Sequence, residues 1–113
     1  VDIETLYAYR MRQMIADKDP VIAPIDQDEW ARNLGYMEES PAELVALYGL
    51  NRHHNTRVLR RLKSGDLEKA AFHPELMEKV TLASYIEKIG GHGTNHLQQI
   101  ERLKKEAAQA KIA

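Results

Sequence analysis

The chain has 113 residues, with 16 basic and 17 acidic side chains that leave a formal net charge of −1, and no cysteine. This length predicts a single domain over residues 1–113, and the balanced charge argues against a nucleic-acid or membrane-surface partner. Without cysteine there can be no disulfide, no thiolate metal ligand and no cysteine nucleophile. No apolar run approaches the ~20 residues that span a bilayer and no signal peptide is visible, so we expect a cytoplasmic protein.

Residues 1–16 predict an amphipathic helix, because their apolar side chains recur at three- and four-residue spacing. Pro20 and Pro24 follow, and proline cannot continue a helix. The helical pattern starts at the first residue, with only Asp2 available as a cap. We therefore expect that an N-terminal segment is missing from the sequence.

A short helix is predicted over residues 27–34, because Asp26 can cap it and an acid follows three positions later. We expect Trp30 to face inward. The motif SPAE at residues 40–43 is a stronger start signal, with serine as the cap, proline at the first helical position and glutamate reaching back. That helix should run to residue 64, where the following glycine supplies a left-handed stop.

The second half of the chain predicts one long helix after an irregular connection. Residues 66–70 indicate at most one helical turn, and residues 72–80 indicate a loop closed by Pro74. Thr81 then caps a final helix that extends to about residue 107. No segment shows the sustained alternation of a strand, so we predict an all-α bundle of three long helices and one or two short ones.

His92 and His96 lie four residues apart on the apolar stripe of this final helix. That spacing stacks two side chains on one face about 5–6 Å apart at Cβ, so both imidazoles can reach one metal ion. A metal would also satisfy ring nitrogens that cost ~1–3 kcal/mol each when buried unpaired. Two hydrogen-bonded core histidines fit the same pattern. Gly90, Gly91 and Gly93 indicate the close approach of another helix or of something bulky.

The remaining polar candidates are more typical of structural roles. We expect His53 and His54 to be surface or rim residues, His73 to fix its loop, and Asn55 to bond across to another helix. Two metal motifs do not fit. The two final-helix histidines lack the glutamate of HExxH between them, and no Glu-x-x-His quartet of the di-iron type occurs.

Five stretches together resemble the DinB-like superfamily, also called the DinB/YfiT-like candidate metalloenzymes: DIETLYAYRMRQMIADKDP, IDQDEWA, SPAELVALYGLNRHHN, FHPELMEKVTL and GHGTNHLQQIERL. The resemblance spans essentially the whole chain, and its most specific element is the closing His-x-x-x-His-Leu-x-Gln-Ile. It implies a four-helix bundle in up-down-down-up order, often dimeric. It also implies one divalent metal held by three histidines, one from the second helix and two from the last.

On this match, His92 and His96 are the metal ligands of the last helix. The family pattern on the second helix is His-x-x-Asp-x-Glu, in which Asp2 and Glu4 match the two acids. The third histidine would then lie two residues upstream of Val1, and the first helix of the bundle would be missing. We expect four further side chains to border the site: Asp2, Glu4, Tyr7 and Gln99.

The resemblance implies a metal-dependent enzyme that lowers the pKa of a small thiol, since the thiolate is the nucleophile. We predict a thiol S-transferase or a hydrolase with one divalent ion, zinc or nickel, and a small-molecule substrate, which for the transferase would be a low-molecular-weight thiol. The alternatives are a non-catalytic metal- or ligand-binding bundle and a structural or dimerisation module. Three helices would leave an apolar stripe exposed, so we expect unseen residues or a second chain, as in a homodimer, to cover it.

Overall fold

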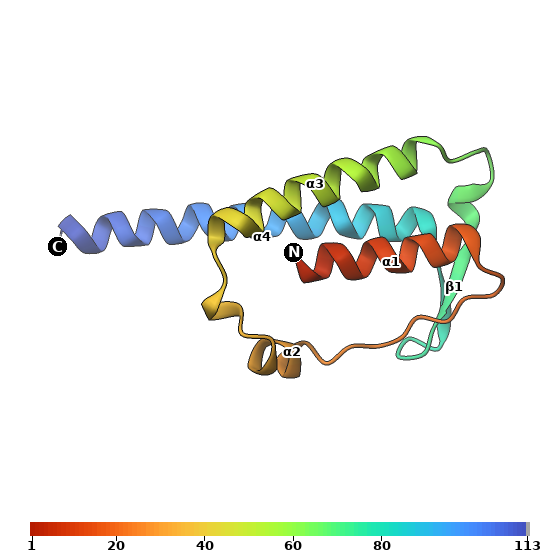
Figure 1. Cartoon of the computed structure of the whole chain (residues 1–113), viewed down its shortest axis with the longest axis horizontal. Coiled ribbons are helices and arrows are strands. Elements are labelled where there is room, and N and C mark those ends of the chain that lie inside the picture. The colour runs from red at the N-terminus through yellow and green to blue at the C-terminus, as the bar shows by residue number, and fades with distance from the viewer. Residues whose placement is uncertain (113) are drawn as a thin grey trace.

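In residues 1–112, which the computed structural model describes, the chain forms four α-helices and one short β-hairpin (Figure 1). The elements, in chain order, are α1 (Asp2–Ala16), α2 (Gln27–Asn33), the 3₁₀ turn η1 (Tyr36–Glu38), α3 (Pro41–Arg60), the 3₁₀ turn η2 (Asp66–Glu68), β1 (Ala70–His73), β2 (Glu78–Thr81) and α4 (Leu82–Ile112). The predicted helical bundle is confirmed. No described helix has the length and apolar content to cross a membrane.

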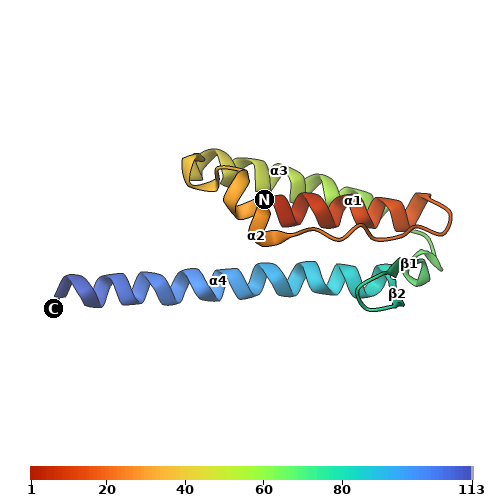
Figure 2. The ribbon, with the colours of Figure 1, turned by 90° about the horizontal axis from the view of Figure 1, so that it is seen from below.

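The three long helices determine the architecture. α1 packs against both α3 and α4, and Figure 2 shows α1 and α3 in one layer with α4 in a second layer. α1 and α3 run in the same direction, whereas α4 runs against both. Because parallel neighbours cannot be joined by a tight turn, residues 17–40 cross back along the length of α1 and carry α2 and η1 on the way. This order matches the last three helices of the predicted up-down-down-up bundle.

Side-chain caps start the helices where the sequence predicts them. Asp26, Ser40 and Thr81 each accept a hydrogen bond from the backbone nitrogen three residues on, at 3.0, 3.4 and 3.2 Å. Such bonds satisfy N–H groups that have no partner within the helix. The helix ends are less well predicted. α3 stops at Arg60 because the chain then tightens into hydrogen bonds between residues three apart, and α4 continues to Ile112.

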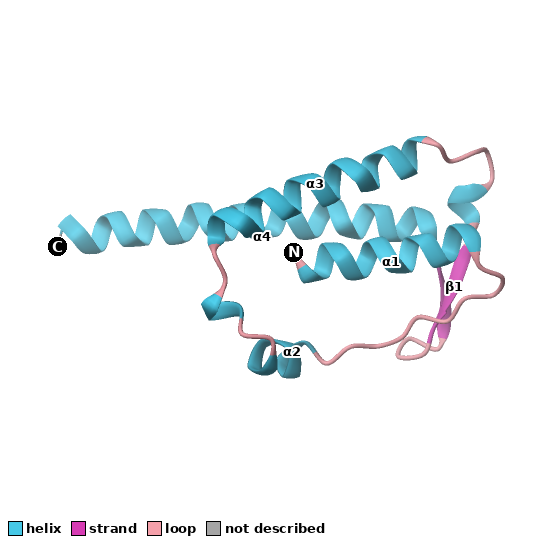
Figure 3. Cartoon of the chain, in the orientation of Figure 1, coloured by secondary structure: helices cyan, strands magenta, loops and turns pink. Residues whose placement is uncertain are grey.

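The β-hairpin corrects the prediction that the chain has no strands and that residues 72–80 form a loop (Figure 3). β1 and β2 pair antiparallel, with Ala70 opposite Thr81 and His73 opposite Glu78. Each strand has four residues and only one fully buried side chain. An alternation this short does not rise above the background of the sequence.

The start of the crossover is tied to the hairpin. The backbone nitrogen of Ile22 donates to the carbonyl oxygen of Phe72 at 2.8 Å, and that of Phe72 donates to the carbonyl oxygen of Pro20 at 3.0 Å. Val21 and Phe72 thereby form a parallel bridge beside β1. This contact anchors the chain just after α1 and buries Ile22.

The hydrophobic core lies at one end of the bundle, where α1 ends, α4 begins and the hairpin closes them off. Its buried side chains are Met11, Met14, Ile22, Ala71, Val80, Leu82, Tyr85 and Ile89. The predicted stripe of α4 is thus confirmed as far as Ile89. Further along α4, Ile100 and Leu103 are 52% and 54% exposed. Figure 1 shows the C-terminal part of this helix extending beyond α1 and α3. Trp30, predicted to face inward, is half-buried.

The glycines of α4 meet very little of the described chain. A Cβ added to Gly90 or Gly91 would meet no atom within 4 Å. At Gly93 it would lie 3.5 Å from the hydroxyl oxygen of Tyr48. Within residues 1–112, the predicted close approach therefore applies to Gly93 alone.

Replacing Gly91 with alanine should raise the free energy of unfolding by about 0.5–1 kcal/mol, because alanine loses less backbone entropy in an open helical position. Gly65→Ala is the matched control. Gly65 has a φ of +93°, so alanine there should lower the free energy of unfolding by about 1 kcal/mol or more. Urea denaturation measures both changes. A destabilising Gly91→Ala would show that a close neighbour covers α4 in the folded protein.

Candidate metal centre

His92 and His96 lie one helical turn apart on α4, just beyond Ile89, the last buried side chain of the core on this helix. Their Nε2 atoms are 3.1 Å apart, and the two ring planes meet at 80°. His92 is half-buried and His96 is exposed. The two rings therefore converge on one point at the edge of the core.

Gln99, which was predicted to border the site, fixes the tautomer of His96. Its side-chain carbonyl oxygen lies 3.1 Å from Nδ1 of His96. A carbonyl oxygen only accepts hydrogen bonds, so Nδ1 carries the proton and Nε2 keeps its lone pair. With both rings neutral, Nε2–H of His92 is the donor across the 3.1 Å contact of the two Nε2 atoms. When His92 takes the other tautomer, both Nε2 atoms present lone pairs to the same point.

This donor set suits a divalent ion such as zinc or nickel, since neutral imidazole binds both. Two nitrogens bonded to one zinc ion at about 2.0–2.1 Å are about 3–3.5 Å apart, and the separation of the two Nε2 atoms falls in this range. Two imidazoles alone make a weak chelate. Across the described residues, no group of three or more His, Cys, Asp or Glu side chains is placed to hold an ion. The third histidine upstream of Val1 stays a prediction.

Tyr7 of α1 lies against the inner side of the pair. Its ring centroid is 6.5 Å from that of His92 and 5.4 Å from that of Tyr85, both in edge-to-face contact. Burial and the neighbouring His96 lower the pKa of His92, and the charge of Glu4 opposes them. His92 therefore favours the neutral form that a metal requires.

Glu4, also predicted to border the site, is bonded to α3. Its carboxylate accepts hydrogen bonds from Nε and Nη2 of Arg52 at 2.8 and 2.9 Å and from the side-chain amide of Asn55 at 3.3 Å. Burial would raise the pKa of Glu4, but these hydrogen bonds and the charge of Arg52 outweigh it and lower the pKa. Asn55 in turn accepts from Arg12 at 3.0 Å, which confirms that it bonds across helices.

Asp2 makes its described hydrogen bond to η1. The hydroxyl of Tyr36 donates to Asp2 at 2.7 Å, and this bond raises the pKa of Tyr36. Asp2 therefore joins α1 to η1. His53 and His54 are exposed on α3, in line with the expectation of surface positions. His73 accepts a hydrogen bond from a backbone nitrogen of the hairpin turn at 3.4 Å, so it fixes this turn as expected.

Tyr48 of α3 is a residue that the sequence interpretation missed. Its hydroxyl oxygen accepts a hydrogen bond from Nη2 of Arg52 at 2.8 Å and faces Gly93 of α4. The available signal was the four-residue spacing of Tyr48 and Arg52, which places both on one face of α3. The sequence does not say that this face meets α4 beside the histidines.

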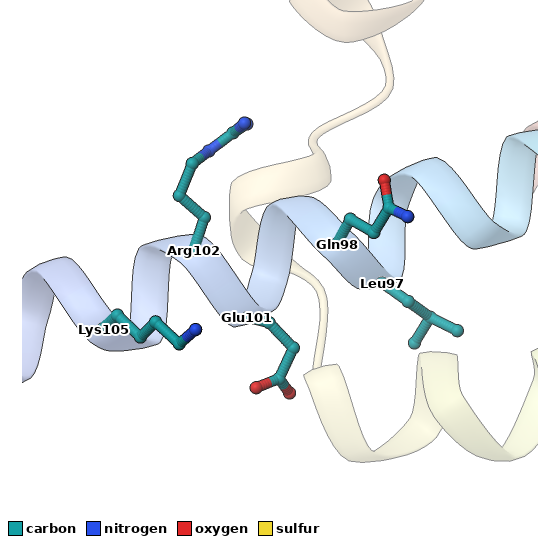
Figure 4. Close-up of a pocket in the computed structure, with 5 residues that line it drawn as sticks. All are labelled: Leu97, Gln98, Glu101, Arg102 and Lys105. Atoms are coloured by element: carbon teal, nitrogen blue, oxygen red, sulfur yellow. The ribbon is translucent and has the colours of Figure 1, made fainter.

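A shallow hollow also runs along the exposed half of α4, beyond His96. It is lined by Leu97, Gln98, Glu101, Arg102 and Lys105. Figure 4 shows Leu97 and Glu101 on one side of the helix and Gln98 and Arg102 on the other. Because these side chains come from one helix and diverge, they do not form a convergent binding site.

Comparisons with known proteins support the same classification. The family model for the DinB superfamily matches residues 1–100. A candidate metal-dependent hydrolase of Oceanobacillus iheyensis is 30% identical over 94 residues, which cover 83% of this chain and 54% of that protein. One of Bacillus cereus is 31% identical over 96 residues, which cover 85% of this chain and 54% of that protein. The chain spans about half the length of the curated relatives it matches.

Among solved structures, YfiT from Bacillus subtilis matches with a TM-score of 0.67 and 23% sequence identity, over 72% of this chain and 46% of that chain. It is described as a candidate metal-dependent hydrolase with an unusual four-helix bundle topology. This likeness supports the fold. The family model covers nearly the whole chain and includes both convergent histidines, and the chain therefore belongs to the DinB superfamily.

Proposed function

We propose that the chain binds one divalent metal ion through His92 and His96 and is part of a metal-dependent hydrolase. The observation that carries this proposal is the 3.1 Å separation of the two Nε2 atoms, with the tautomer of His96 fixed by Gln99. The names of the relatives support a metal-dependent hydrolase. They favour hydrolysis of a small molecule over the predicted thiol transfer.

The chain's own residues prepare the site for an ion. Gln99 holds His96 with its lone pair toward His92, and partial burial lowers the pKa of His92, which favours its neutral form. The ionised Glu4 adds a negative charge near the rings while Arg52 holds it in place. When bound, a divalent ion acts as a Lewis acid and lowers the pKa of a water or thiol that joins it.

Several finer expectations stay predictions. These are zinc or nickel as the ion, the histidine upstream of Val1 as its third ligand, the homodimer and the cytoplasmic location. The exposed Leu97, Ile100 and Leu103 of α4 support a covering partner, because such a row of large apolar side chains is costly to leave in water.

Removing either imidazole should weaken binding of zinc or nickel by more than about tenfold, since each ring supplies one of few ligands. Calorimetric titration of His92→Ala and His96→Ala measures the loss. The chain itself should bind weakly, and a natural form that carries the upstream histidine should bind about one ion per protomer. His53→Ala removes an exposed histidine of α3 and should leave the affinity unchanged. If all variants bind zinc or nickel with equal affinity, His92 and His96 are not metal ligands and have a structural role in the bundle.

His92 should titrate below the ordinary histidine value of about 6.5 in the metal-free protein. Because its folded-state pKa is lowered, its contribution to the free energy of unfolding is present above about pH 6.5 and is lost as the pH falls through the folded value. Protons should likewise displace the ion from His92 only below the ordinary range. An NMR titration of the ring, assigned with His92→Asn, measures the pKa. A value above 6.5 would contradict the burial of this ring.

A further inference from the structure

The guanidinium of Arg52 is oriented by hydrogen bonds to a buried carboxylate. Two of its nitrogens, Nε and Nη2, donate to the two carboxylate oxygens of Glu4, and only 5% of the Glu4 side chain is exposed. A planar fork held by two parallel bonds has one orientation. Asn55 bonds to the same carboxylate and so fixes Glu4 as well. The guanidinium of Arg52 is therefore held in a defined orientation beside α1.

The same guanidinium also binds the hydroxyl group of Tyr48. Nη2 of Arg52 also donates to the hydroxyl oxygen of Tyr48 at 2.8 Å, and the guanidinium carbon lies 5.3 Å from the centre of the Tyr48 ring. A guanidinium only donates, so the hydroxyl oxygen of Tyr48 is the acceptor and its own hydrogen must point elsewhere. Tyr48 is half-buried, so this hydrogen remains available to water or to a ligand. The adjacent cation polarises the O–H bond and strengthens it as a donor.

The hydroxyl group of Tyr48, from α3, lies against the part of α4 that carries the two histidines. Its oxygen is 3.5 Å from the position that a Cβ would take on Gly93, and Nη2 of Arg52 is 3.9 Å from that position. Gly93 directly follows His92 and precedes His96 by three residues, so residues 93 and 96 are neighbours on the surface of α4. With glycine at position 93, no side chain separates the phenol from this surface of α4.

A simpler interpretation is that Tyr48 only strengthens the contact between helices. The contact of α1 with α3 does not need it, however, because Glu4 and Asn55 already join these helices. Tyr48 itself makes its one described hydrogen bond within α3, to Arg52. Its hydroxyl hydrogen is therefore available to a ligand that enters beside Gly93.

We propose that Tyr48, positioned by Arg52, donates a hydrogen bond to an anionic oxygen of the ligand that binds at His92 and His96. This inference rests on the proposed metal site and adds to it the class of ligand, a carboxylate or another oxyanion. A phenol that is already polarised by a guanidinium stabilises negative charge on such an oxygen. Arg52 acts as a positioning residue because its contact with the ligand runs through Tyr48.

The test is a titration of acetate into the cobalt(II)-loaded natural form that carries the upstream histidine, followed by the visible absorption of the ion. Tyr48→Phe should weaken acetate binding about tenfold, which corresponds to about 1.4 kcal/mol. It should leave the affinity for cobalt unchanged, since the phenol is not a ligand. Tyr9→Phe is the matched control, because Tyr9 is 60% exposed on α1 and should have no effect.

Two further arms test the positioning role and the ligand class. Lysine in Arg52→Lys keeps the positive charge but cannot bond to Glu4 and Tyr48 in the same fixed geometry, so this variant should bind acetate more weakly. Adding Tyr48→Phe to Arg52→Lys should cause little further loss of acetate affinity. With 2-mercaptoethanol the loss in Tyr48→Phe should be smaller, because sulfur is a weak acceptor. A loss at least as large for the thiol would overturn the assignment to oxygen.

The outcomes separate this inference from the proposed function. If wild-type protein takes up cobalt and Tyr48→Phe binds acetate as tightly as wild type, the role of Tyr48 is refuted and the metal site stands. If His92→Ala and His96→Ala do not change cobalt uptake, the metal site and this inference both fail. Additive losses in the double variant would show that Arg52 does not act through Tyr48.

Discussion

The buried carboxylate of Glu4 is the constraint on which the rest of the structure depends. A lone carboxylate in the interior would lose its hydration, so the fold must supply both charge and hydrogen bonds to it. Arg52 and Asn55 of α3 do so, and their bonds lower the pKa of Glu4 below its ordinary value despite its burial. This requirement sets how α3 lies along α1, because the two helices must bring these groups into register.

The long helix α4 links two different environments. Its first two turns carry Leu82, Tyr85 and Ile89 into the core, whereas its second half runs beyond α1 and α3. The two histidines occupy the boundary between these regions. Side chains there have packed turns behind them and remain accessible from the open side, which suits the metal site proposed above.

Much of this arrangement could be read from the sequence, for clear physical reasons. Caps such as Ser40 act through local backbone geometry, and the four-residue spacing of His92 and His96 directly predicts convergence on one helix face. The hairpin could not be read because its strands are four residues long and lie beside Pro74. The role of Tyr48 depends on how α3 and α4 meet in space, and no local pattern records that contact.

The bridge between residues 20–22 and β1 bears on how the chain folds. It joins segments about fifty positions apart in the sequence, and the core needs both of them in place. The hairpin and the helices can form from local contacts, but closing a loop of this length loses chain entropy before the buried surface compensates for it. Docking of Ile22 beside Phe72 is thus a long-range step that local helix formation does not accelerate. The rate of folding should follow this closure more closely than the helical propensity of α3 or α4.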